Sequence, residues 1–136
     1  MDKLIPNYDK DWVPEGYVKI SSGPNAGLLC RAEYLSISDD EKNEICNGIG
    51  ASEGLSKHFP NTIWFLDCTE AGNIHDYDYY IGGTSYDKQV ADTVFLFNLY
   101  ALIQKGSWLL RGIRRDRANA YYLALRACGG KHYNFK

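Results

Sequence analysis

The longest helical pattern in this chain lies between residues 85 and 105, where apolar side chains recur every three to four positions. A run this rich in apolar residues predicts a helix that is buried on more than one side. The positions that carry the pattern are Val90, Val94, Phe95, Phe97, Leu99, Leu102 and Ile103.

A second helix is predicted immediately before this one. Asp67 or Thr69 can cap its start, and Glu70 in the first turn suits the helix dipole. The glycine pair at 82–83 ends it. Because the link to the next helix is so short, we expect the two helices to run antiparallel.

Shorter patterns predict the remaining elements. Residues 113–128 place small and aromatic side chains on one helical face, and Ser38 with Glu41 forms a capping box that predicts a helix over residues 39–46. Two short apolar runs around a turn-rich stretch predict a small β-hairpin near residues 17–32. We therefore expect a mainly α protein, a single domain over residues 1–136, with two antiparallel helices, a further C-terminal helix and this hairpin.

Composition limits the possible environments. A length of 136 residues is enough for one hydrophobic core, and a formal net charge of -2 gives no general attraction to nucleic acid, so no nucleic-acid partner is expected. The four cysteines form no CxxC pair and are expected to be buried and reduced. The first residues lack a signal-peptide pattern, so we expect a cytoplasmic protein, or one delivered by a route that needs no signal peptide.

The candidate chemistry centres on His75, Asp76 and Tyr79 in the second predicted helix. Residues four apart share a helical face, so His75 and Tyr79 point one way and Asp76 another. Because the helix over residues 85–105 runs antiparallel to this one, it brings Asp92, 17 residues after His75 (92 − 75), within reach of the imidazole. A carboxylate behind an imidazole fixes its tautomer, which lets the histidine act as a general base.

Asp76 then remains available for a metal ion. Calcium prefers carboxylate, carbonyl and water oxygens, and the glycine-rich bend near Gly48 and Gly50 offers unhindered carbonyls. The expected cofactor is therefore Ca²⁺, with Asp76 and the loop carbonyls as ligands.

These residues together resemble the phospholipase A2 superfamily. His75-Asp76-x-x-Tyr79 looks like its HDxxY helix, the glycine-rich stretch upstream like its calcium loop, and His75 with Asp92 like its catalytic dyad. The resemblance spans about residues 45–100 and implies calcium-dependent cleavage of an sn-2 acyl ester in a phospholipid, with Tyr79 helping to hold Asp92. Two departures stand out: the disulfide cysteines of the secreted members are missing here, and the glycine spacing in the loop differs.

Other interpretations remain open. His75 alone could be a buried core histidine. Asp92 could instead pair with an arginine or lysine on the helix over residues 85–105 or on the helix over residues 113–128. A catalytically inactive binding or interaction module with the same core is the main alternative function. Metal-dependent phosphohydrolases also use an adjacent His-Asp pair, but they need further histidines on helices, and His58 lies in a proline-flanked loop.

A basic cluster precedes and begins the last helix. Arg111, Arg114 and Arg115 follow Trp108 closely, and their side chains could contact phosphate or lipid, with the tryptophan as an interfacial anchor. Alternatively, these arginines are solvated charges at the start of the helix and bind no ligand. The expected partners are thus a phospholipid substrate or a membrane surface, and the sequence does not specify an oligomeric state.

Overall fold

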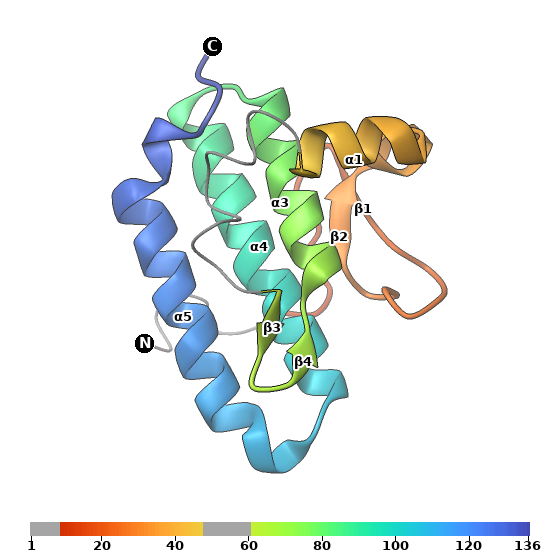
Figure 1. Ribbon diagram of the computed structural model, residues 1–136, viewed down its shortest axis with the longest axis vertical. Coiled ribbons are helices and arrows are strands. Elements are labelled where there is room, and N and C mark those ends of the chain that lie inside the picture. Colours follow the sequence, from red (N-terminus) through yellow and green to blue (C-terminus); the bar gives the residue numbers. More distant parts are fainter. Residues whose placement is uncertain (1–8, 48–60) are drawn as a thin grey trace.

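Three long helices stand side by side within the described residues, 9–47 and 61–136, of this computed structural model (Figure 1). Helix α3 spans Thr69–Ile81, α4 spans Ser85–Lys105 and α5 spans Arg111–Cys128. Helix α4 packs against both α3 and α5 and runs antiparallel to each (Figure 1). The predicted mainly α architecture, with an antiparallel pair and a C-terminal helix, is confirmed.

Helix α4 has the predicted ends and is buried on two sides. The Thr84 hydroxyl accepts from the Asp87 backbone N–H at 3.2 Å, and the Asp87 carboxylate accepts from the Thr84 N–H at 2.8 Å. This capping box satisfies two N–H groups at the helix start. One side of α4 joins the main core, and the other joins a smaller cluster of Tyr17, Leu29, Val94 and Phe97.

The turn between α3 and α4 depends on glycine. Gly82 and Gly83 have φ of 73° and 142°, and a Cβ on Gly82 would lie 1.9 Å from the Asn134 carbonyl oxygen. The end of the chain binds here: the Gly83 N–H donates to the Asn134 carbonyl at 3.0 Å, and the Lys136 N–H donates to the Gly83 carbonyl at 2.8 Å. These contacts hold the turn that sets the register of α3 against α4.

The predicted N-terminal hairpin is present and packs on α4. Strands β1 (Tyr17–Lys19) and β2 (Leu29–Arg31) pair antiparallel. The buried amide of Asn98 accepts from the Leu29 N–H at 2.7 Å and donates to the Leu29 carbonyl at 2.9 Å. One side chain of α4 therefore satisfies both backbone groups of a β2 residue.

Helix α1 (Asp39–Asn47) confirms the prediction for residues 39–46, and Ser38 Oγ accepts from the Glu41 N–H at 3.1 Å as a cap. A 3₁₀ turn, Ala32–Ser36, precedes it. Glu70 of α3 accepts from the Tyr34 hydroxyl at 3.1 Å and from Lys42 Nζ at 3.0 Å. The glutamate thus ties α1 and its preceding turn to α3.

Two features around the lower end of Figure 1 differ from the sequence prediction. A second hairpin, β3 (Thr62–Ile63) and β4 (Leu66–Asp67), forms just before α3. Helix α5 begins at Arg111, two residues before the predicted start, because the 3₁₀ turn Trp108–Leu110 leads straight into it. Another 3₁₀ turn, Gly129–Lys131, follows α5.

The cysteines confirm the expectation of free thiols. Cys30, Cys46 and Cys68 are buried, whereas Cys128 is exposed, and none of the four is in a disulfide. Noncovalent contacts therefore hold the helices together. In the part of the chain that the structure describes, no helix has the length and apolar character needed to span a bilayer.

Candidate catalytic site

The antiparallel arrangement of α3 and α4 brings His75 and Asp92 together. His75 Nε2 lies 3.0 Å from Asp92 Oδ1, and the Tyr79 hydroxyl donates to the same oxygen at 2.6 Å. His75 is 4% exposed and Asp92 is fully buried. The contact that the spacing predicted therefore forms, inside the helical core rather than at its edge.

The second carboxylate oxygen of Asp92 binds two cations. Lys88 Nζ and Arg126 Nη1 each lie 2.9 Å from Asp92 Oδ2. Lys88 Nζ also donates to the Leu125 carbonyl at 3.0 Å. Both interpretations of Asp92 thus hold at once, since the carboxylate pairs with the His75 imidazole and also with Lys88 of α4 and Arg126 of α5.

These donors keep Asp92 ionised. Burial would raise the pKa of the Asp92 carboxyl, but hydrogen bonds and charge from His75, with further hydrogen bonds from Tyr79 and Lys88, outweigh it and lower the pKa to about 2. An ionised Asp92 can only accept, so Nε2 of a neutral His75 carries the proton and Nδ1 carries the lone pair. Of the described residues, none forms a hydrogen bond with Nδ1. Nδ1 is therefore the nitrogen that can receive a proton from a reactant.

Aromatic rings hold the imidazole in place. The ring centroids of Tyr79 and Phe95 lie 4.2 Å and 4.8 Å from that of His75. Gly129 gives the Tyr79 hydroxyl its room, because a Cβ there would lie 2.6 Å from the hydroxyl oxygen. The backbone after α5 therefore closes over the side of Tyr79 that faces Asp92.

Asp76, the expected calcium carboxylate, is half-buried one position along α3. Burial raises the pKa of its carboxyl to about 7. Within residues 9–47 and 61–136, no group donates a hydrogen bond to this carboxylate. Such a carboxylate fits a metal ligand, because a cation would supply the charge partner that it lacks there.

The other expected calcium ligands cannot be placed. Gly48 and Gly50 lie outside the described residues. Among the described side chains, no group of three or more His, Cys, Asp or Glu residues could hold a metal ion. Asp76 is thus the one predicted calcium ligand whose surroundings the structure describes, and the geometry of a complete site stays a prediction.

Of the four predicted lipid-contact residues, three are at least partly exposed, namely Trp108, Arg111 and Arg115, and Arg114 is buried. Trp108 is 72% exposed, and Arg115 lies with its guanidinium 5.9 Å from the Tyr100 ring centroid. Arg111 is half-buried and donates to the Gln104 carbonyl at 2.8 Å. Arg114 is 5% exposed, and its guanidinium donates to the Trp64 carbonyl at 2.6 Å and 3.2 Å. Arg114 shares the inner face of α5 with Ala118, Tyr121 and Leu125, so it does not contribute to an exposed basic cluster.

Sequence reasoning did not identify Lys88 and Arg126 as neighbours of Asp92. The i,i+4 spacing of Lys88 and Asp92 on one helix was a usable signal, because such positions face each other. Arg126 had no comparable signal, since only the packing of α5 on α4 brings it to Asp92.

A second buried carboxylate lies on α3 and has partners other than those of the dyad. Asp78 is fully buried, accepts from the Tyr17 hydroxyl at 2.9 Å, and lies 3.3 Å from Arg31 Nε. Burial raises the pKa of Asp78 to about 7, although the Tyr17 hydrogen bond and the Arg31 charge act in the opposite direction. This cluster joins α3 to the N-terminal hairpin, and we assign it no catalytic role.

Comparison of the chain with known protein families, curated proteins and solved structures finds no match. No relative therefore contributes a function for this chain. The chemistry of the site itself points to a function: a buried histidine has one nitrogen fixed by an ionised carboxylate, and it lies beside an aspartate without a charge partner among the described residues.

Proposed function

We propose that this protein is a calcium-dependent carboxylic ester hydrolase of the phospholipase A2 type. The observation that supports this most strongly is the pairing of His75 Nε2 with the ionised Asp92, which leaves Nδ1 as a proton acceptor. The adjacent Asp76 supplies a carboxylate for a cation. The substrate class, an sn-2 acyl ester of a phospholipid, follows from the HDxxY resemblance.

The proposed reaction uses His75 as the general base. Nδ1 takes a proton from a water molecule while the water oxygen attacks the ester carbonyl carbon. Asp92 stabilises the imidazolium that forms, and Tyr79 holds Asp92 through its 2.6 Å hydrogen bond. The imidazolium then returns the proton to the departing alkoxide as the ester C–O bond breaks, which yields a carboxylic acid and an alcohol.

Asp76 would hold the calcium ion, together with loop carbonyls at Gly48 and Gly50. When bound, calcium supplies a Lewis acid that polarises an ester carbonyl and stabilises negative charge on its oxygen. The support for this role is the half-buried carboxylate itself, whose pKa of about 7 reflects burial without a described partner. Asp76 and His75 lie next to each other on α3, so metal binding and proton transfer would occur at neighbouring positions.

The first prediction concerns calcium and activity. On mixed phospholipid micelles with calcium we expect release of free fatty acid, and we expect excess chelator or Asp76→Asn to slow it about 10²–10³-fold, the size typical of a lost oxyanion partner. Asp40→Asn, which neutralises an exposed aspartate of α1, is the matched control and should retain activity. Equal turnover of the wild type in chelator would exclude the calcium mechanism.

The second prediction concerns stability and pH. The pKa values of Asp76 and Asp78 are both about 7 in the folded protein, against an ordinary value of 3.8. The folded state therefore holds protons that the unfolded chain releases, so the free energy of unfolding should fall as pH rises from about 4 to 7, by at most about 1.4 kcal/mol per pH unit for each group.

Urea denaturation at pH 5, 6, 7 and 8 in chelator measures this slope. Asp76→Asn should make it shallower, and calcium at pH 8 should raise the stability of the wild type but not of Asp76→Asn. A slope that is the same in both proteins would mean that Asp76 is solvated and ionised throughout this range.

One observation favours a second candidate function, an inactive binding module. Asp92 pairs with Lys88 and Arg126 as well as with His75, so the fold has a structural reason to keep this residue without catalysis. Such a module would show neither ester hydrolysis nor calcium-dependent stabilisation. The micelle assay and the denaturation series together separate the two functions.

A further inference from the structure

The turn of the β3–β4 hairpin carries two exposed aromatic residues in an unfavourable backbone conformation. Trp64 and Phe65 have φ of 47° and 69°, the left-handed region that two-residue hairpin turns of this kind normally fill with asparagine and glycine. Phe65 is 90% exposed and Trp64 is 45% exposed. Neither the turn nor the core explains the choice of these side chains.

The turn is held firmly against the start of α5. Both the Nε and Nη2 atoms of the buried Arg114 donate to the Trp64 carbonyl, at 3.2 Å and 2.6 Å. Gly106 leaves room for this guanidinium, because a Cβ there would lie 2.8 Å from Arg114 Nη1 and 3.7 Å from Leu66 Cδ1. Arg114 therefore ties the β3–β4 turn to the start of α5, beside Gly106 of the α4–α5 connection.

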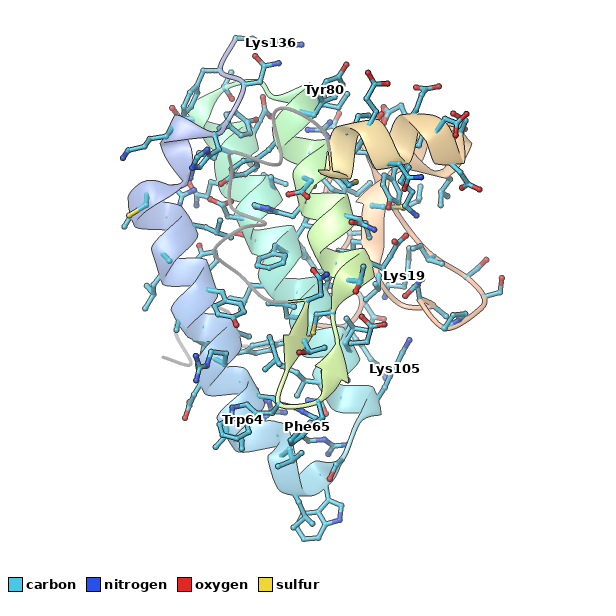
Figure 2. The ribbon with its side chains drawn as sticks, in the orientation of Figure 1. Lys19, Trp64, Phe65, Tyr80, Lys105 and Lys136 are labelled. Carbon is cyan, nitrogen blue, oxygen red and sulfur yellow. The ribbon has the colours of Figure 1, made fainter. Side chains whose placement is uncertain are left out.

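That connection also exposes large apolar side chains. Trp108 and Leu109 are 72% and 71% exposed, and Ile113 is 41% exposed. Figure 1 places the hairpin beside the α4–α5 connection at one end of the molecule, and Figure 2 shows Trp64 and Phe65 at that end. We call Trp64, Phe65, Trp108 and Leu109 the apolar tip.

The segment that carries Trp108 and Leu109 is basic although the chain is acidic. Apart from the buried Arg114, residues 105–117 hold four cations, Lys105, Arg111, Arg115 and Arg117, against the single anion Asp116, a formal balance of +3 (4 − 1) in a chain whose net charge is -2. Lys105 and Arg117 are exposed, and Arg111 and Arg115 are half-buried. Cations beside exposed tryptophan complement the phosphates of an anionic lipid surface.

We propose that the apolar tip inserts into the headgroup region of an anionic phospholipid bilayer, with Lys105, Arg111, Arg115 and Arg117 on lipid phosphates. The apolar side chains project from two turns at an end of the molecule, which suits shallow insertion, and the +3 balance of the charges in residues 105–117 that are not buried matches anionic headgroups. This inference does not rest on the proposed hydrolysis, because docking needs neither His75 nor calcium.

The third prediction tests the tip with vesicles. The experiment uses the His75→Gln background, so that hydrolysis cannot alter the lipid, and measures co-sedimentation with vesicles of phosphatidylcholine alone or mixed with phosphatidylserine. We expect binding to the anionic vesicles, a blue shift of tryptophan fluorescence, and weaker binding when NaCl is raised from about 0.1 M to 0.5 M.

The decisive variant is Trp64→Asn/Phe65→Gly, which installs the dipeptide that this turn prefers and keeps the backbone carbonyl that Arg114 binds. Its melting temperature should equal or exceed that of the parent, whereas its binding to anionic vesicles should fall at least about tenfold, because two large side chains no longer leave water. Tyr80→Gln, at a 60% exposed tyrosine near the opposite end in Figure 2, is the matched control and should bind as the parent does.

Three outcomes would overturn the proposal. The parent could fail to bind vesicles of either composition, the tip variant could bind as well as the parent, or Tyr80→Gln could lose as much binding as the tip variant. Light scattering on the same proteins measures their oligomeric state and so tests the alternative that a second copy of the chain covers the apolar tip. Tip-dependent dimers without vesicle binding would assign the tip to self-association instead.

Discussion

Replacing His75 with glutamine is expected to lower ester hydrolysis about 10²–10⁴-fold, the contribution typical of a general base. Glutamine keeps a polar side chain of similar reach toward Asp92 but cannot take a proton from water at neutral pH. Fatty-acid release from mixed micelles, measured at saturating calcium, gives the size of the loss.

The same variant should keep its response to calcium. His75 is not an expected calcium ligand, so the rise in melting temperature on adding calcium should match that of the wild type. A variant that loses activity and calcium response together would place the imidazole at the metal instead. Retention of full activity would rule out His75 as the base and leave the inactive-module interpretation or another hydrolytic site.

The Asp92→Asn variant is expected to lose about 3–5 kcal/mol of unfolding free energy, as well as most of its activity. An amide cannot neutralise Lys88, which is 5% exposed, or the Arg126 guanidinium beside it. Removing one partner of a buried ion pair leaves the other charge uncompensated, which is strongly destabilising. Urea denaturation at pH 7 measures the loss.

A second substitution separates the structural role of Asp92 from its catalytic role. In Asp92→Asn/Lys88→Met the buried cation is gone, so much of the stability should return, whereas the hydrolytic rate should stay low because His75 still lacks its carboxylate. Lys88→Met alone serves as the reference for the double-mutant cycle. If the double variant is no more stable than Asp92→Asn, the Lys88–Asp92 pair does not account for the destabilisation.

Local signals were sufficient to predict the element that matters most for the site. The ends of α4 follow from Thr84 and Asp87 at one end and Gly106 at the other, all of which act within one turn of the helix. The short glycine link then made α3 and α4 antiparallel, which places His75 opposite Asp92. The contact between these two residues was therefore predictable without knowledge of the rest of the fold.

What could not be predicted depends on packing between distant segments. Arg126 reaches Asp92 only because α5 lies on α4, and the sequence gives no register for that contact. The β3–β4 turn was missed because Trp64 and Phe65 are not turn-forming residues. The inward position of Arg114, by contrast, follows from helical spacing, since it lies four, seven and eleven residues before the buried Ala118, Tyr121 and Leu125.

The position of Asp92 also affects how its presence in a homologous protein can be interpreted. Its carboxylate connects α3, α4 and α5 through His75 and Tyr79, Lys88, and Arg126. Selection for a stable fold would preserve it in a lineage that had ceased to turn over any substrate. Retention of Asp92 is therefore poor evidence for catalysis among homologues, and drift at His75 or Asp76 beside an invariant Asp92 would be the mark of lost activity.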